Sequence, residues 1–181
     1  MSLRFTALSE ADARDIIAWR YEGPYAVYNL PDPALGGDFD ALTEMLDPRS
    51  PHFAVREAGQ ADEQAEAPLI GFFSYGSSCE VGGEETAGVA TPYLLRPDGS
   101  ITIGLGLRPD ATGQGRGLEL VEALLAFARE RYHPSLFRLY VYSWNERALR
   151  VYKRAGFTSV GVTRIQAPEG ERVFIEMTRP A

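Results

Sequence analysis

The feature that most constrains the fold of this chain is a glycine-rich turn between two periodic segments. Glycines occupy positions 113, 115 and 117, after an apolar stretch at 101–107 and at the start of an amphipathic stretch at 117–132. The first stretch predicts a strand and the second a helix, and another strand is expected at 137–142. This β-α-β order indicates an α/β fold with a mixed sheet covered by helices on both faces, not a barrel.

Further elements are expected on both sides of this unit. The strands that we predict there lie at 3–7, 52–56, 69–75, 88–95, 158–166 and 172–178. One helix is expected from Ser9, which forms a weak capping box with Asp12, to about Arg20. Another starts near Asp38 and ends at Pro48, because proline does not continue a helix.

Two loops and a last helix complete the pattern. Residues 19–29 gather four aromatic side chains around a Gly-Pro break, which indicates an aromatic loop. Residues 57–68 contain no aromatic or branched aliphatic side chain, so we expect a long, mobile hairpin loop there. Asn145 is expected to cap the last helix, and Gly156 stands where a left-handed C-terminal cap is needed. We predict a single domain over 1–181.

Composition narrows the class of protein. The net charge of −7 disfavours partners such as nucleic acid or an anionic membrane. No apolar run approaches the roughly 20 residues that span a bilayer, and no signal-peptide core follows Met1, so a cytoplasmic location is expected. Cys79 is the only cysteine and there are two histidines, so we expect neither an internal disulfide nor a metal site.

The glycine turn has the composition of an anion site. Glycines permit positive φ, and the backbone N–H groups of such a turn converge at the start of the helix, where the helix dipole favours a phosphate. A P-loop and a dinucleotide fingerprint are both excluded, because Leu118 and Glu119 follow Gly117. The remaining alternative is a tight strand-to-helix connection in which the glycines serve packing alone.

The distribution of charge favours a ligand at this turn. Residues 108–154 contain nine Lys and Arg against five Asp and Glu, a net charge of +4, so the rest of the chain has −11. A local excess of positive charge in an acidic protein attracts a polyanion to that region. The alternative is a solvated helical face, which accounts for Arg129 and Arg131 far along the helix.

Two segments in the second half resemble the GNAT superfamily of N-acetyltransferases. Residues 107–117 are similar to its acetyl-CoA loop, and residues 142–157 are similar to its signature N-x-x-A-x-x-x-Y-x-x-x-G-F. The resemblance implies a mostly antiparallel, twisted sheet and acetyl-CoA as co-substrate, with no metal. It also implies a coenzyme-binding core at about 101–157 and acceptor-side helices at about 9–47. A homodimer is a separate expectation.

The resemblance also implies which residues contact acetyl-CoA. They are Leu105, Leu107, Thr112, Gly113, Gln114, Gly115, Arg116, Gly117 and Asn145. Gly104 and Gly106 weaken a normal strand, so the pantetheine arm is expected to approach its main chain, and a main-chain N–H near Leu107 would stabilise the oxyanion. The family usually has Arg or Gln where Thr112 stands, so we expect main-chain donors to dominate at the phosphates.

Tyr152 is the expected catalytic residue. In the matching family position a tyrosine hydroxyl protonates the leaving sulfur, and a phenol with a pKa near 10 is chemically suited to that step. The alternative is a core tyrosine, because Tyr152 shares a helical face with Ala148, Val151 and Ala155. Cys79 lies beside Glu80 in an acidic neighbourhood, which is unfavourable for a nucleophilic thiol.

The acceptor side is less defined by the sequence. In the family the connection between the first two helices lines the acceptor site, which points to Trp19, Tyr25, Tyr28 and Asn29, whereas a minor aromatic core is the alternative. The strand at 101–107 has no carboxylate, so no general base is assigned. The acidic residues left for that role are Glu22, Glu80, Glu84, Glu85 and Asp98.

Three functions are consistent with these features. The first is transfer of an acetyl group from acetyl-CoA to a primary amine by direct attack. The second is a non-catalytic sensor that binds acyl-CoA, which the absence of a strand carboxylate favours and Tyr152 opposes. The third is an interaction domain without a ligand, which the local positive charge disfavours.

Overall fold

The computed structural model describes residues 2–31, 40–58, 67–81, 94–168 and 170–181. It contains two compact units, one made of Met1–Ser74 with Leu105–Gln114 and the other of Tyr75–Gly104 with Gly115–Ala181. Seven strands form a sheet in the order β1-β2-β3-β4-β5-β7-β6. Antiparallel pairs predominate and only β4 with β5 is parallel among the registers described, which confirms the predicted mixed, mostly antiparallel α/β fold.

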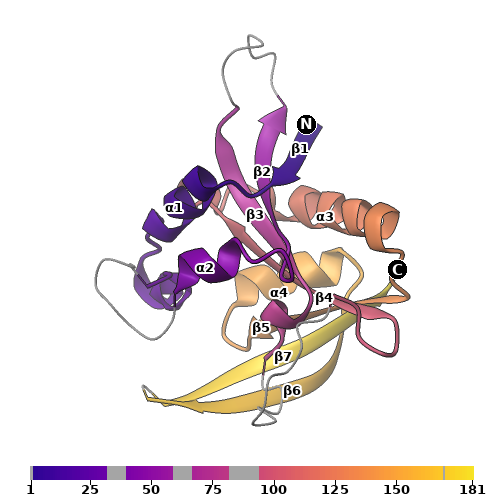
Figure 1. Cartoon of the computed structure of the whole chain (residues 1–181). Coiled ribbons are helices and arrows are strands. Elements are labelled where there is room, and N and C mark those ends of the chain that lie inside the picture. The colour runs from indigo at the N-terminus through magenta and orange to yellow at the C-terminus, as the bar shows by residue number, and fades with distance from the viewer. Residues whose placement is uncertain (1, 32–39, 59–66, 82–93, 169) are drawn as a thin grey trace. The chain divides into compact units, whose positions relative to one another are not determined.

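The first unit is built on an antiparallel ladder (Figure 1). Its strands are β1 (Ser2–Ala7), β2 (His52–Ala58) and β3 (Leu69–Tyr75). Phe5 faces Val55 and Val55 faces Gly71, and the register between β2 and β3 shifts after Val55. The predicted hairpin connection between β2 and β3 is confirmed by this pairing, and most of the predicted mobile loop, 59–66, lies outside the described residues.

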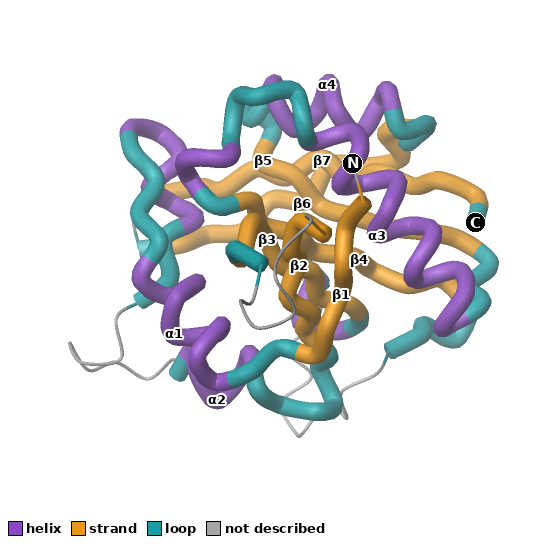
Figure 2. The backbone as a smooth tube through the Cα atoms, turned by 90° about the horizontal axis from the view of Figure 1, so that it is seen from above, coloured by secondary structure: helices purple, strands orange, loops and turns teal. Residues whose placement is uncertain are grey.

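Helices α1 (Glu10–Ala18) and α2 (Ala41–Met45) pack together in this unit (Figure 2). The predicted capping box between Ser9 and Asp12 is confirmed, with both reciprocal hydrogen bonds present. Their apolar faces meet β2 and β3 in a core of Ala13, Ile16, Ile17, Trp19, Ala41, Met45, Ala54 and Leu69. A buried ion pair between Asp12 and Arg56 joins the first turn of α1 to β2.

Two predictions concern the segments before and at the start of α2. One needs correction, and the other falls on residues that the structure does not describe. The segment predicted as an aromatic loop contains a 3-10 helix, η1 (Gly23–Tyr28), because Pro24 presets the φ angle that the start of a helix requires. The predicted start of the second helix near Asp38 lies outside the described residues. Within them, the helix begins after Asp40, whose carboxylate accepts hydrogen bonds from the N–H groups of Leu42 and Thr43.

The second unit contains the predicted helix α3 (Gly117–Tyr132), strand β5 (Leu136–Tyr142) and helix α4 (Glu146–Arg154). The long hairpin β6 (Thr158–Ala167) and β7 (Gly170–Pro180) continues the sheet from β5 (Figure 1). One face of α3 supplies Leu120, Val121, Leu124, Leu125 and Ala128 to the core. The predicted Asn145 cap and the left-handed Gly156, with φ of 83°, are both confirmed.

Strand β4 (Ser100–Leu107) contributes its first residues to the second unit and its last three to the first. Its parallel register with β5 covers only Ser100–Thr102 against Leu136–Arg138. Ahead of β4, the predicted strand at 88–95 lies mostly outside the described residues, and Leu95 forms one isolated antiparallel bridge with Ile101. The short 3-10 helix η3 (Ser77–Cys79) follows β3.

Candidate active site

The three glycines of the turn have two different roles. Gly113 and Gly115 adopt φ of 77° and 78°, and a Cβ at either position would meet no atom within 4 Å. Their glycine identity is therefore required by backbone conformation. Gly117 has an ordinary φ, but a Cβ there would lie 3.1 Å from Val151 Cγ2, so this glycine lets α3 approach α4. The packing alternative holds for Gly117 and the conformational interpretation for the other two.

The N-terminus of α3 has the properties of an anion site. Arg116 is its N-cap and makes no side-chain cap hydrogen bond. The first N–H groups of a helix lack acceptors within the helix, and the dipole of this 16-residue helix adds partial positive charge at the same end. A phosphate group fits such an end because it supplies both the acceptors and the charge.

The side chains of the turn brace the turn itself. Thr112 Oγ1 donates to the carbonyl of Pro109 at 2.7 Å, and Gln114 Nε2 donates to the carbonyl of Asp110 at 2.7 Å. Arg108 forms an ion pair with Asp110 at 2.8 Å, and that hydrogen bond raises the pKa of the guanidinium and lowers the pKa of the carboxyl. These contacts favour a site whose donors to an anion come chiefly from the main chain.

The end of β4 is fixed against β3 in the first unit. A Cβ on Gly106 would lie 2.3 Å from the ring of Phe72, and one on Gly71 would lie 2.8 Å from the carbonyl oxygen of Gly106. Gly106 is therefore a glycine because the Phe72 ring lies across it, a reason that the sequence did not reveal. Arg108 N–H donates to the carbonyl of Ile70 at 2.9 Å. Because successive residues of a strand point their N–H and C=O groups to alternate sides, those of Leu107 point away from β3.

Tyr21 is a residue that the sequence analysis missed. Its hydroxyl donates to the carbonyl oxygen of Leu107 at 2.7 Å, across 86 positions of sequence. Asn29, which we predicted to contact the acceptor, binds the backbone of Tyr21 twice. Its Oδ1 accepts from Tyr21 N–H at 2.7 Å and its Nδ2 donates to the Tyr21 carbonyl at 3.2 Å. No local pattern signals the contact of Tyr21 with Leu107, because it joins segments that are far apart in the sequence.

The other predicted acceptor residues differ in exposure. Trp19 is only 7% exposed and packs against Phe72, so it belongs to the core, as the alternative interpretation held. Tyr28 is 38% exposed and meets Tyr21 edge-on, with 6.3 Å between ring centroids. Tyr25 is half-buried. Of the predicted set, Tyr25, Tyr28 and Asn29 therefore retain some exposed surface, whereas Trp19 does not.

Tyr152 lies on α4 beside the start of α3. It is half-buried and meets Phe157 edge-on, with 6.0 Å between ring centroids, so part of its side chain stays exposed. Its neighbour Val151 makes the contact with Gly117 described above. Asn145 is buried, and its Oδ1 accepts from Ala148 N–H at 3.1 Å. The helix that presents Tyr152 is thus packed against the uncapped end of α3.

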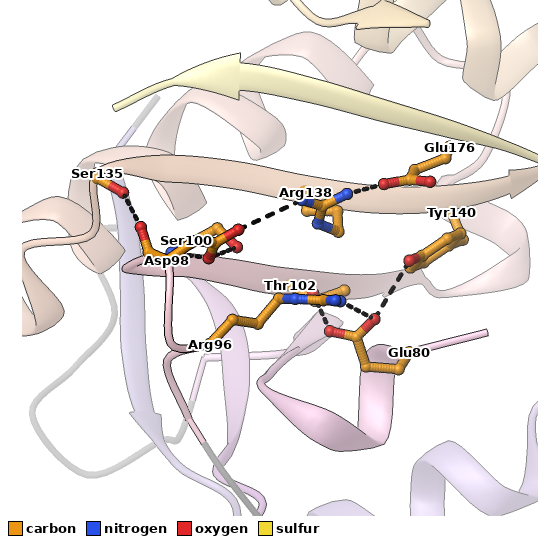
Figure 3. A network of polar contacts seen from close by, with 9 residues as sticks. All are labelled: Glu80, Arg96, Asp98, Ser100, Thr102, Ser135, Arg138, Tyr140 and Glu176. Carbon is orange, nitrogen blue, oxygen red and sulfur yellow. Dashed lines mark hydrogen bonds and ion pairs between the residues drawn. The ribbon is translucent and has the colours of Figure 1, made fainter. Parts of the chain in front are cut away.

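Glu80 is held by three donors (Figure 3). Its carboxylate accepts hydrogen bonds from Thr102 Oγ1 at 2.5 Å, Arg96 Nη1 at 2.9 Å and Tyr140 OH at 3.2 Å. Burial, followed by the charge of Glu80, raises the pKa of the Tyr140 hydroxyl. Both carboxylate oxygens are engaged, so Glu80 joins the segment after η3 to β4 and β5 and is poorly suited to act as a general base.

A second part of this network surrounds Asp98, another acidic candidate. Asp98 Oδ1 accepts from Ser100, and its main-chain carbonyl accepts from Ser135 (Figure 3). The hydrogen bonds from Ser100 lower the pKa of this carboxyl. Asp98 therefore shapes the turn before β4. Glu22 is exposed, and Glu84 and Glu85 lie outside the described residues.

Two kinds of feature are absent from the described residues. Within them, no three His, Cys, Asp or Glu side chains gather in a way that would hold a metal ion. None of the described helices is long and apolar enough to cross a membrane.

Comparison with known proteins decides the family. The model of the acetyltransferase (GNAT) domain matches residues 2–158, which is most of the chain. The chain belongs to the GNAT family. It is therefore an acyltransferase that uses acetyl-CoA as co-substrate, as the two sequence motifs predicted.

Solved structures of GNAT enzymes share the fold. Spermidine N-acetyltransferase from Vibrio cholerae in complex with CoA and spermine is 18% identical, with a TM-score of 0.69 over 98% of this chain and 95% of that one. The dodecameric structure of the Vibrio cholerae enzyme in an intermediate state is 17% identical, with a TM-score of 0.64 over 98% and 93%. At these identities the likeness shows the fold alone.

Proposed function

We propose that this GNAT protein moves an acetyl group from acetyl-CoA to a primary amine by direct attack within a ternary complex. The observation that carries the proposal is the contact of Val151 with Gly117, because it brings the helix of Tyr152 against the uncapped end of α3. One domain over 1–181 performs the reaction. The segment at 101–157 binds the coenzyme, and the segment at 9–47 serves the acceptor.

The coenzyme is held mainly by backbone groups in this proposal. The pyrophosphate is assigned to the start of α3, because Gly113 and Gly115 before it adopt positive φ and turns of this kind offer main-chain N–H groups to an anion. Leu105 and Leu107 turn their main-chain groups away from β3. The groups of Leu105 receive the pantetheine arm, and Leu107, whose carbonyl accepts from Tyr21, offers its N–H to the thioester. The residues assigned to the coenzyme are Leu105, Leu107, Thr112, Gly113, Gln114, Gly115, Arg116, Gly117 and Asn145.

The chemical step needs no covalent enzyme intermediate. The neutral amine nitrogen attacks the thioester carbonyl carbon, and Leu107 N–H stabilises the oxygen that becomes negative. The carbon–sulfur bond then breaks, and Tyr152 donates its hydroxyl proton to the departing thiolate. The ammonium form of the acceptor gives a proton to solvent before the attack, and the attacking nitrogen gives a second proton to solvent after it. The Tyr152 phenolate recovers its proton from solvent. Holding both substrates in position contributes on the order of 7 to 11 kcal/mol to such a step in favourable cases.

The acceptor is proposed to be a cationic amine. The net charge of −7 attracts a cation, and Tyr25 and Tyr28 offer flat rings with hydroxyl groups at the side where the family binds its acceptor. Asn29 supports this surface by holding the backbone of Tyr21. Spermidine and spermine belong in the test panel because the structural neighbours are spermidine N-acetyltransferases.

Thermal unfolding with acetyl-CoA, and with ATP and NAD as anionic controls, tests the coenzyme site first. A ligand that binds only the folded state raises the midpoint of thermal unfolding. At a ligand concentration of 100 times the dissociation constant, the free energy of unfolding increases by about 2.7 kcal/mol. We expect a rise with acetyl-CoA alone. Equal rises with all three anions would contradict a specific site.

Thiol release with a panel of amines then tests the reaction. We expect Tyr152→Phe to lose turnover by about 100-fold or more while it keeps the rise in midpoint with acetyl-CoA. Tyr132→Phe, which changes another half-buried tyrosine at the far end of α3, should retain turnover. If the unmodified protein bound acetyl-CoA but released no thiol with any amine, it would be a sensor and not a transferase.

A further inference from the structure

We propose that Tyr21 is a positioning residue for acetyl transfer, and that it holds the peptide between Leu107 and Arg108 in the orientation that the reaction requires. This inference rests on the proposed function, in which Leu107 N–H stabilises the oxyanion. Asn29 completes the device because its side-chain amide fixes the backbone of Tyr21.

The peptide after Leu107 is pinned at both ends. Its carbonyl oxygen accepts from Tyr21 OH at 2.7 Å, and its N–H, which belongs to Arg108, donates to the carbonyl of Ile70 at 2.9 Å. Rotation of this peptide would break both hydrogen bonds. The main-chain N–H of Leu107 belongs to the preceding peptide and points to the same side of β4 as the Leu107 carbonyl, so Tyr21 restrains the strand at the residue that carries this N–H.

Tyr21 also has an electrostatic effect at this place. The carbonyl of Leu107 directs its negative end toward the side of β4 on which the proposed oxyanion forms. A carbonyl dipole without a donor would oppose that negative charge, and the Tyr21 hydroxyl offsets it by donating a hydrogen bond. Removal of the hydroxyl should therefore weaken binding of the transition state more than binding of acetyl-CoA.

Asn29 makes Tyr21 rigid from the other side of η1. The two hydrogen bonds of its amide close the loop from Tyr21 to Asn29, and the edge of Tyr28 meets the ring of Tyr21 within that loop. An amide that bonds both backbone groups of one residue restrains it more than one hydrogen bond would. Asn29 therefore acts through Tyr21, not on the substrate.

Steady-state kinetics of Tyr21→Phe, Asn29→Ala and the double variant test this chain of contacts. Loss of one hydrogen bond of about 1 to 1.5 kcal/mol corresponds to a roughly tenfold change. We expect Tyr21→Phe to lower kcat about tenfold, with KM for acetyl-CoA within about twofold of the unmodified value. Asn29→Ala should lower kcat similarly. The kcat of the double variant should be no more than about twofold below that of Tyr21→Phe, because both changes disrupt the same contact between Tyr21 and Leu107.

Tyr75→Phe is the matched control. Tyr75 also donates from its hydroxyl to a main-chain carbonyl, that of Leu124 at 3.3 Å, and it has no place in the proposed reaction. We expect kcat of this variant to stay within about twofold of the unmodified value, because the lost hydrogen bond costs stability and not turnover. Asn29→Asp keeps the acceptor for Tyr21 N–H and loses the donor, so its kcat should lie between those of the unmodified protein and Asn29→Ala.

Three outcomes would overturn the proposal. They are an unchanged kcat in Tyr21→Phe, a loss that appears only in KM, and losses that multiply in the double variant. Failure of the proposed function is separate, because the unmodified protein would then release no thiol with any amine. If Tyr21→Phe folds poorly, the contact between Tyr21 and Leu107 can still be tested in Asn29→Asp. The amide chemical shift of Arg108 should then change, because Arg108 N–H and the Leu107 carbonyl belong to one peptide.

Discussion

The second unit contains two helix N-termini that solve the same problem in different ways. Helix α4 begins after Asn145, whose Oδ1 satisfies the N–H of Ala148 at 3.1 Å. Helix α3 begins after Arg116, which makes no side-chain cap hydrogen bond, and the turn before it contains glycines with positive φ. One N–H group at the N-terminus of α4 is satisfied by a side chain, whereas the N-terminus of α3 has no side-chain cap.

The comparison extends to the first unit. Ser9 caps α1 and Asp40 caps α2, so α3 is the one α-helix of the described residues that begins without a side-chain cap. A cap adds typically about 1 kcal/mol of stability. The longest of these helices, α3, begins without this contribution, at the end where we propose that acetyl-CoA binds.

The largest effect is expected at the uncapped end. Gly115→Ala forces an L residue into φ near 78°, which costs about 1 to 2 kcal/mol. We expect the backbone of the turn to change conformation in response, so that its N–H groups are reoriented. We expect the affinity for acetyl-CoA to fall about tenfold or more, measured by calorimetry, because 1.4 kcal/mol is tenfold in affinity.

Gly99→Ala is the control for this change. Gly99 has φ of 77°, and a Cβ there would meet the hydroxyl of Ser135, so the variant has at least as large a stability cost. Its affinity for acetyl-CoA should stay unchanged. Equal losses of affinity in both variants would show that general destabilisation, not the geometry of the turn, controls binding.

A smaller effect is expected at the capped end. Asn145→Ala removes the cap of α4 and should cost about 1 kcal/mol, or about 2 to 4 °C in Tm for a chain of this size. Asn145→Asp retains a capping oxygen and should recover most of the stability, measured by thermal unfolding. If Asn145→Asp were as unstable as Asn145→Ala, the hydrogen bond to Ala148 would not be what stabilises α4.

The smallest effect is a pH dependence of the cap of α2. Hydrogen bonds from the side chain and then the backbone of Thr43 hold the pKa of Asp40 below its usual value. A carboxyl whose pKa is lower in the folded state stabilises the protein above its unfolded pKa, about 3.9, and this stabilisation is lost as the pH falls through the folded value.

Asp40→Asn measures this contribution, because asparagine caps without titrating. We expect the difference in Tm between Asp40→Asn and the unmodified protein to be constant above about pH 5 and to move in favour of the variant as the pH falls below 3.9. A difference that does not change with pH would mean that the cap works through its uncharged hydrogen bonds alone.

The local signals in the sequence predicted much of the coenzyme side. The bounds of α3, the capping box of Ser9, the cap at Asn145 and the left-handed Gly156 all match the structure. Each depends on residues within a few positions, so propensity, periodicity and capping suffice to find it. The acceptor side was less predictable, because η1 replaced the expected loop and Trp19 was drawn into the core.

The sequence by itself thus determined the β-α-β unit, the glycine turn and the family, since these depend on the order of neighbouring residues. Only the tertiary structure decided that Gly117 serves packing on Val151, that Gly106 makes room for the ring of Phe72, and that Tyr21 reaches the carbonyl of Leu107. These contacts join segments far apart in the chain. Strand pairing and helix packing create them, and no local pattern encodes which distant side chain fills a given space.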